Sequence, residues 1–198
     1  MKQTKDLGYK SEARRGLLFV FMAGVLWSTV GLGIKMIDEA TVWQILLYRS
    51  ISLSLFLAIV IYLRSSENLF TVVRAAGLPA CIAGLALVGA YAGGIYGIQS
   101  TSVANAMLLF ASAPFMAAIL GWIFLREKVR KATWVSILFA ILGIGIMVQD
   151  KSQGSALLGN LAALGSAFGF AVFTVALRWG RSGEMLPAVF LSGIFAIL

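Results

Sequence analysis

The chain has 198 residues, of which 60% are hydrophobic and 12% charged, and its mean hydropathy is +0.93. A soluble domain is closer to half apolar and a quarter charged, so lipid must cover part of this excess of apolar surface. The formal net charge of +8 is spread among apolar runs and forms no patch, which excludes a nucleic-acid-binding surface. With no histidine and one cysteine, Cys81, no metal site, cofactor or disulfide is expected.

Seven apolar segments follow one another, and each is predicted to be a helix because lipid-facing backbone must satisfy its own hydrogen bonds. They are residues 17–36, 42–63, 76–98, 103–124, 133–148, 157–177 and 186–198. Five have roughly the 17–25 residues that cross a bilayer, whereas 133–148 is slightly short and is anchored by Trp134. No strand alternation typical of a membrane barrel is present. The predicted fold is an all-α integral membrane protein, a polytopic helical bundle.

Basic residues lie mostly on one side of the predicted helices. Thirteen of the 16 Lys and Arg residues precede the first helix or lie in every second loop, whereas Lys35 and Lys151 lie in the alternate loops. The positive-inside rule then predicts a cytoplasmic N-terminal segment, 1–15, of a multi-pass protein in the cytoplasmic (inner) membrane. The densest group, REKVRK at 126–131, is interpreted as a topological anchor; the alternative is a site for an acidic lipid or a nucleotide.

A weak internal repeat appears when the chain is shifted by 143 residues. Small and basic side chains on one helix face of the first segment recur in the sixth. These are Gly24, Ser28, Gly31 and Lys35 and, in the second copy, Ala167, Ala171, Thr174 and Arg178. The first repeat, 16–148, contains five helices, so a second copy that starts at 157, after an external loop (149–156), is inverted in the membrane. Residues 157–198 are expected to be its truncated start, with about 100 residues to follow.

Three stretches carry a resemblance to a known family. They are "RGLLFVFMAGVLWSTVGLGIK", "LLYRS" and "SVANAMLLFASAPFMAAILGWIFLREKVRKATWVSILFAILGIGIM". Together they resemble the first half of the drug/metabolite transporter superfamily, EamA-like branch. The resemblance implies ten helices in two inverted five-helix repeats, both termini cytoplasmic, and the movement of amino acids, related metabolites or drugs, often outward. This chain departs from that pattern in lacking most of the second repeat.

Arg49 is a candidate substrate-binding residue. It lies about eight residues inside the second predicted helix, about 12 Å from the start by helical rise, where a charge is costly and is a functional candidate by default. It would meet a substrate carboxylate in a cavity. Alternatively, it reaches outward toward Asp38 or Glu39, or bonds a helix-end carbonyl. The resemblance carries the YR pair onto Tyr48 and Arg49 and implies no proven role for either residue.

The third predicted helix contains glycines at every fourth position, Gly89, Gly93 and Gly97, which favours close packing against another helix. Tyr96 projects near this face and is a candidate for a cavity wall, whereas Tyr91 points nearly opposite. The alternative for Tyr96 is a hydrogen bond between helices.

Pro114 interrupts the fourth apolar segment and predicts a kinked helix that serves as a gate, with a purely structural bend as the alternative. Asn105 and Ser112 are seven residues apart on one face and are candidates to line a polar cavity beside the kink. In the first segment, Trp27 and Ser28 offer a stacking surface and a hydroxyl near mid-membrane, unless Trp27 faces lipid.

The leading hypothesis for function is a secondary transporter, an exporter of small metabolites such as amino acids, that works by alternating access. The alternative is a non-transporting membrane scaffold or subunit, or an inactive fragment of a transporter. An intramembrane enzyme is disfavoured because there is no histidine and no carboxylate within a predicted helix. The expected partners are the lipid bilayer, a small-molecule substrate, and a second copy of the chain or a missing C-terminal half.

Overall fold

The computed structural model describes residues 2–37, 39–64, 69–149, 156–180 and 185–198. All regular secondary structure in these ranges is helical, which confirms the predicted all-α class. The chain divides into two units, Met1–Asp38 and Glu39–Leu198, and each is described by itself. Five helices are long and apolar enough to cross a membrane, namely Gly16–Lys35, Val42–Leu63, Arg74–Ser100, Val103–Leu125 and Leu157–Trp179.

The first unit contains one helix, α1 (Lys2–Lys35). Its apolar part, Gly16–Lys35, agrees with the predicted segment. The helix begins far earlier than that segment, however, so the separate N-terminal segment expected at 1–15 is an extension of α1. The stretch KSEARR just before the span explains this extension, because Lys, Glu, Ala and Arg are all good helix formers.

The second unit contains seven helices within its described residues. They are α2 (Val42–Arg64), α3 (Leu69–Ser100), α4 (Val103–Phe110), α5 (Ala113–Leu125), α6 (Lys131–Gln149), α7 (Ala156–Trp179) and α8 (Leu186–Ile197). Each apolar segment predicted from 42 onward corresponds to one of these helices, except that 103–124 forms two. The expected start of the third segment at 76 coincides with a break in α3 at Gly77, whose φ of 64° is outside the helical region. The external loop expected at 149–156 lies mostly outside the described residues.

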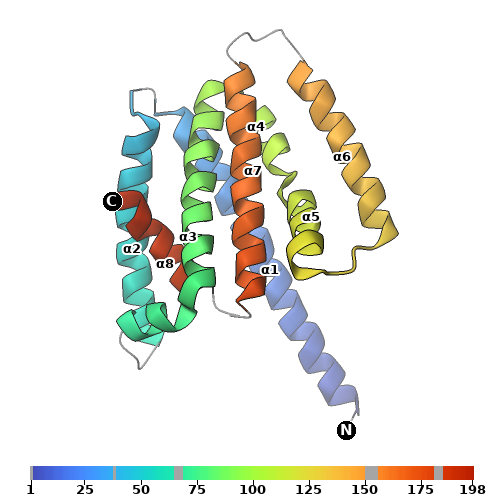
Figure 1. Cartoon of the computed structure of the whole chain (residues 1–198). Coiled ribbons are helices and arrows are strands. Elements are labelled where there is room, and N and C mark those ends of the chain that lie inside the picture. The colour runs from blue at the N-terminus through green and yellow to red at the C-terminus, as the bar shows by residue number, and fades with distance from the viewer. Residues whose placement is uncertain (1, 38, 65–68, 150–155, 181–184) are drawn as a thin grey trace. The chain divides into compact units, whose positions relative to one another are not determined.

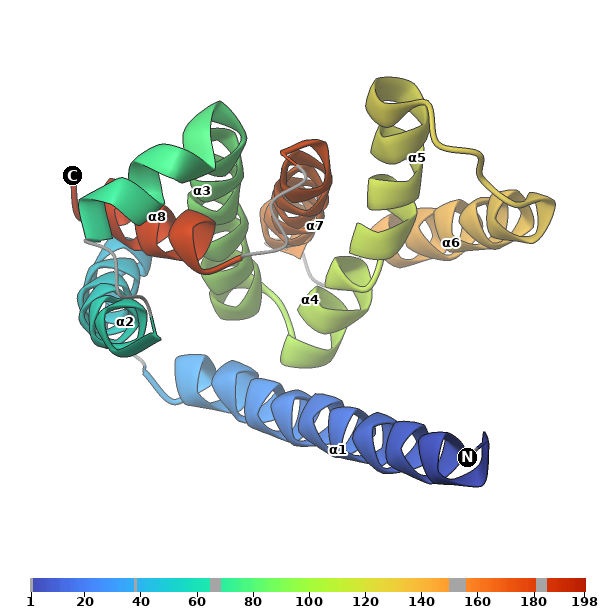
Figure 2. The ribbon, with the colours of Figure 1, turned by 90° about the horizontal axis from the view of Figure 1, so that it is seen from below.

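Helix α7 is the centre of the second unit (Figure 1). It packs against α3 on one side and against α4 and α5 on the other, and the view along the helices shows the same order (Figure 2). Helix α8 packs against α2 and α3, whereas α6 touches α5. The largest buried apolar cluster is formed where α3, α7 and α8 meet, around Leu87, Phe173 and Leu191. The first helix of the expected second repeat is therefore packed among the helices of the first.

Glycines bring α3 and α7 into backbone contact. A Cβ on Gly93 would lie 2.7 Å from the carbonyl oxygen of Ala162, and a Cβ on Gly169 would lie 2.7 Å from that of Ala86. Gly97 also faces α7, where a Cβ would lie 3.1 Å from the Cβ of Ala163. Two of the three predicted packing glycines thus lie in a helix contact. The two helices approach closely because neither carries a side chain at these points.

Gly89 does not take part in this contact, which corrects the prediction for the third glycine. It is exposed, and a Cβ there would meet nothing within 4 Å. Instead, Gly89 lines an open apolar groove of about 480 Å³ with Gly165 and Phe168 of α7. The physical reason is rotation about the helix, since a spacing of four residues advances by 40° per step and drifts off any fixed contact line.

Candidate functional site

The fourth apolar segment, Val103–Leu125, is one membrane span whose helix is interrupted just before Pro114, and Ala111 and Ser112 at the interruption keep right-handed helical dihedrals. Helix α4 ends at Phe110, two turn residues follow, and α5 begins at Ala113 with Pro114 in its first turn. Proline is tolerated at that position because the first N–H groups of a helix have no partner within it. The segment is thus described as two helices in series, α4 and α5, within one span, with the interruption beside Pro114 where the sequence predicts a kink. Whether this break acts as a gate stays a prediction.

Ser112 lies in this break, and its hydroxyl donates to the carbonyl of Leu109 at 2.6 Å. The side chain is 4% exposed and bonded to its own chain. Ser112 thus forms a hydrogen bond at the end of α4, and its place in a substrate cavity stays a prediction.

Asn105 links α4 to α7. Its amide nitrogen donates to the side-chain oxygen of Asn160 and to the hydroxyl of Thr101, the latter at 3.2 Å. Asn160 is 3% exposed and comes from the apolar start of α7. The hydroxyl of Ser102 accepts from the backbone N–H of Asn105 and caps α4, which fixes the position of this side chain. The result is a partly buried polar link between the α4–α5 segment, here called the broken helix, and α7.

Arg49 contacts Tyr91 across the α2–α3 interface. Its guanidinium carbon lies 3.5 Å from the centroid of the Tyr91 ring, which is a close cation–π contact. The Nη1 atom is buried and has no hydrogen-bond partner among the described residues. Of the two acidic residues suggested as partners, Asp38 lies outside the described residues, and Glu39 forms no described ion pair with Arg49.

In this arrangement, Nη1 of Arg49 can still donate hydrogen bonds to a ligand. A buried donor without an acceptor costs free energy unless a ligand supplies one. The ring of Tyr91 covers one face of the guanidinium, and stacking leaves the in-plane N–H groups free to donate. Planar carboxylates are the acceptors that match such a group best, because both oxygens can be bonded at once. Among the described residues, Nη1 of Arg49 is the one buried cationic nitrogen without a hydrogen-bond partner.

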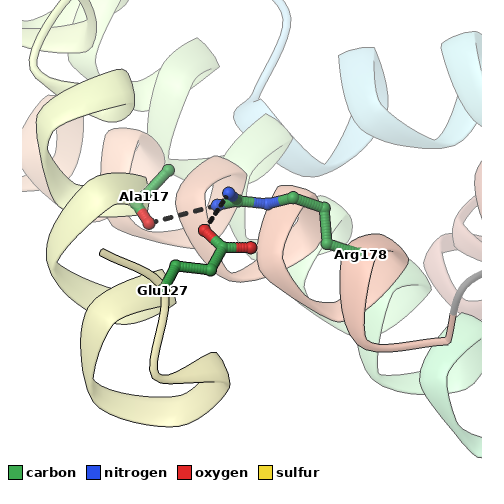
Figure 3. A network of polar contacts seen from close by, with 3 residues as sticks. All are labelled: Ala117, Glu127 and Arg178. Atoms are coloured by element: carbon green, nitrogen blue, oxygen red, sulfur yellow. Dashed lines mark hydrogen bonds and ion pairs between the residues drawn. The ribbon is translucent and has the colours of Figure 1, made fainter. Parts of the chain in front are cut away.

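Arg178 makes a second polar link between the broken helix and α7, at the other end of both. Its Nη1 donates to Oε2 of Glu127 at 2.6 Å and its Nη2 to the carbonyl oxygen of Ala117 at 3.2 Å (Figure 3). Gly121 provides the room, since a Cβ there would lie 2.8 Å from Oε2 of Glu127. Both charged side chains are about 40% exposed, so this link is at the edge of the helical unit.

The other candidates are not gathered around Arg49 by any described contact. Tyr48 is 71% exposed and Tyr96 38%. In α1, Trp27 is 50% exposed and the hydroxyl of Ser28 donates to the carbonyl of Gly24 in its own helix at 2.9 Å. Because α1 belongs to the first unit, the position of these two residues relative to Arg49 is not defined.

The sequence does not predict three contacts of the candidate site: Tyr91 beside Arg49, Asn160 beside Asn105, and the Glu127–Arg178 pair. Asn160 had a signal, since it is a lone amide within an apolar segment. Glu127 had one too, as the single acid in a basic group. Tyr91 had none, because its distance from Arg49 in sequence carries no information about contact.

Five apolar spans, with polar groups paired between helices rather than exposed to lipid, define a polytopic membrane protein. The model of the EamA-like transporter family matches residues 14–149. The chain therefore belongs to this family, as the resemblance implied.

Individual relatives agree with this assignment. The chain is 29% identical over 195 residues to Protein RarD of Salmonella typhi, covering 94% of this chain and 64% of the relative. It is 33% identical over 87 residues to the uncharacterized transporter YetK of Bacillus subtilis (strain 168), covering 41% and 26%. Identity to solute carrier family 35 member G1 of Mus musculus is 25% over 194 residues, covering 88% and 50%. These matches span about a quarter to two-thirds of the relatives' own lengths, and no solved structure matches significantly.

Proposed function

We propose that the protein is a secondary transporter that exports small metabolites, such as amino acids or related compounds, and that it is not an enzyme. Membership of a transporter family supports the general activity. A solute with a carboxylate is favoured by Arg49, whose buried Nη1 has no partner among the described residues. This single observation carries the choice of substrate class.

The binding step follows from the geometry of Arg49. Tyr91 holds the guanidinium flat, so its orientation is set before a substrate arrives and little rotamer entropy is lost on binding. A carboxylate that enters would accept a hydrogen bond from Nη1 and pair with the positive charge of Arg49. This pairing is stronger at a buried site than in water, because the local dielectric constant is lower. Tyr48 and Tyr96 remain candidates for the surrounding wall.

Alternating access is proposed to involve the broken helix and α7. The two are joined by polar links at both ends, Asn105–Asn160 at one and Arg178 with Ala117 and Glu127 at the other. The first repeat is proposed to be 16–148 and the inverted second repeat to begin at 157, so these links join the two repeats. Opening one link while the other stays closed would expose a central site to one side at a time, and the break before Pro114 would allow it.

The proposed setting is the cytoplasmic (inner) membrane with the N-terminus in the cytoplasm. Thirteen of the 16 basic residues then lie on the cytoplasmic side, as the positive-inside rule requires. Export would begin with binding from that side. A second copy of the chain or a further C-terminal half is proposed as the partner that completes the cavity.

The test compares solutes with and without a carboxylate. Uptake of a panel of labelled amino acids, and of the amines that lack only the carboxylate, is measured in everted membrane vesicles. We expect at least one amino acid to be transported, and kcat/KM for it to fall by about thirtyfold or more in Arg49→Gln, because a buried charge pair loses one partner. The amine should be transported poorly and equally by both proteins.

Two controls make this result specific. Arg49→Lys keeps the charge and should retain part of the activity, whereas Arg74→Gln removes an exposed arginine of α3 and should leave transport unchanged. Equal kinetics of Arg49→Gln and the original protein on every transported amino acid would contradict the assignment of Arg49. Transport of none of the panel would contradict the proposed substrate class.

A further inference from the structure

We propose that the end of α5 and the start of α6 form a binding site for a phosphate group, occupied by the headgroup of an anionic phospholipid. The site is a pocket of about 680 Å³, here called the corner pocket, which falls within the usual size of small-molecule sites. Its lining consists of Trp122, Ile123, Arg126, Glu127, Lys128, Val129 and Trp134. The proposal rests on the membrane spans and is independent of the substrate, direction and mechanism of transport.

The charge of the corner pocket favours an anion. Its one acidic group, Glu127, is already engaged by Arg178 at 2.6 Å. Arg126 and Lys128 are exposed, and neither has an ion-pair partner among the described residues. The ion pair with Arg178 thus offsets the acid and leaves two cations at the mouth of the pocket. A phosphodiester accepts hydrogen bonds from both guanidinium and ammonium groups.

The backbone of Arg126 has a conformation that is unusual for a residue with a side chain. Its φ of 54° and ψ of 31° are left-handed, and it is the one non-glycine residue with positive φ among the described residues. Its N–H and that of Glu127, the latter at 3.2 Å, both reach the carbonyl of Gly121 and end α5. Glycine is the usual residue at such a helix end, because a Cβ strains this conformation. An arginine here strains the backbone and places a cation in the pocket, which favours a function for that cation.

The apolar part of the lining favours a lipid over a soluble anion. Trp122 and Ile123 are at least half exposed and belong to the last turn of the span Val103–Leu125. Trp134 packs edge-on against Trp122, with ring centroids 5.4 Å apart. Tryptophan is typical of the boundary between hydrocarbon and headgroups. The corner pocket therefore joins an apolar wall at the level of the acyl chains to two cations at the level of the phosphate.

The experiment measures the lipid preference of the pocket. The purified protein is placed in phosphatidylcholine nanodiscs that contain a minor fraction of brominated phosphatidylglycerol or, in parallel, brominated phosphatidylcholine. Bromine quenches nearby tryptophan, and the Trp122→Phe/Trp134→Phe variant isolates the signal of the pocket. Measurements at about 0.5 M salt reduce the Debye length to about 4 Å, so general attraction of basic loops is screened. We expect stronger quenching by brominated phosphatidylglycerol.

Matched variants separate the pocket from its surroundings. Arg126→Gln/Lys128→Gln should weaken the apparent affinity for phosphatidylglycerol about thirtyfold, since each side chain would lose a direct hydrogen bond to the phosphate and one such bond contributes about fivefold. Arg130→Gln/Lys131→Gln removes the same charge from the same loop outside the lining, and should leave the affinity unchanged. Arg126→Gly should weaken it about fivefold with the unfolding temperature unchanged or raised, because glycine relieves the left-handed strain.

Competition with inorganic phosphate distinguishes a lipid phosphate from a soluble phosphate as the occupant of the pocket. Displacement of the lipid by inorganic phosphate at constant ionic strength would support the phosphate site with a soluble occupant as well. No displacement, with the preference for phosphatidylglycerol retained, would support the lipid. Equal quenching by the two brominated lipids, or an equal loss in both double variants, would overturn the proposal.

Discussion

The two faces of α3 differ in how they meet their neighbours. Toward α7 the contact is closed, since Gly93 leaves no room for a methyl group and the hydroxyl of Ser166 donates to the carbonyl of Ala90 at 2.6 Å. Toward α2 the contact is made by Tyr91, which stacks on Arg49 and leaves Nη1 buried without a described partner. The contact with α7 is closely packed, whereas the contact with α2 leaves a hydrogen-bond donor of Arg49 available for a ligand.

We interpret this difference as a division of roles between the two faces of α3, one of which supports the fold while the other binds substrate. Backbone contact between α3 and α7 offers few alternative arrangements, because interpenetrating glycines fix both the separation and the register. A cation held by a ring can still gain hydrogen bonds from a ligand. We therefore interpret the α3–α7 contact as a rigid base and the α2–α3 contact as the site of binding. Substitutions on the two faces of α3 should therefore have different effects on stability and on transport.

The largest effect on stability is expected for Gly93→Ala. Its Cβ would lie 2.7 Å from the backbone of Ala162, which cannot move aside like a flexible side chain, so the helices must separate. Overpacking of this kind lowers the free energy of unfolding by about 1–3 kcal/mol. The measurement is reversible unfolding in a denaturing detergent. Gly89→Ala is the matched control, expected to be neutral or slightly stabilising, and equal losses in the two variants would show that the α3–α7 face is not closed.

A smaller effect is expected for Tyr91→Leu. Loss of the ring removes the cation–π contact with Arg49 and should lower the free energy of unfolding by about 1 kcal/mol. Transport should also fall, because the guanidinium is no longer held in one orientation. Tyr91→Phe keeps the ring and should resemble the original protein in both assays. If Tyr91→Phe loses as much stability and transport as Tyr91→Leu, the hydroxyl rather than the ring face is responsible, and the proposed role of Tyr91 is wrong.

The smallest effect is expected for Ser166→Ala. The hydroxyl bond to Ala90 is lost, but the carbonyl that accepted it belongs to a helix in which backbone N–H groups also bond such oxygens. Single hydrogen bonds between membrane helices average about 0.6 kcal/mol, and we expect a loss of that size in the same unfolding assay. A loss larger than that of Gly93→Ala would mean that hydrogen bonding, and not close backbone approach, holds α3 to α7.

Much of the fold could be predicted from the sequence because the signal is local. Seven apolar segments were placed within a few residues of the helical spans, since hydropathy depends only on neighbouring side chains. There are two exceptions. Helix α1 begins at Lys2, well before its apolar span, and the segment around Pro114 is divided into α4 and α5 because proline has no N–H with which to continue the helical hydrogen bonds.

Less of the candidate site could be predicted. Arg49 was found because a charge inside an apolar segment is conspicuous in sequence. Tyr96 was preferred to Tyr91 on the assumption that the glycine face borders the cavity, whereas Tyr91 is the residue that contacts Arg49. The hydrogen bond between Asn105 and Asn160 could not be predicted either, because the two residues are 55 positions apart in the sequence.

The helical class, the order of the spans, the family and the asymmetry of basic charge can all be read from the amino-acid sequence. These properties follow from composition along the chain and from patterns within one segment. Only the tertiary structure decided that Asn160 meets Asn105, that Glu127 meets Arg178 and that Gly89 is left outside the packed face. Such pairs depend on the rotation and separation of whole helices, which are set jointly by all the contacts between them and are encoded in no single stretch of sequence.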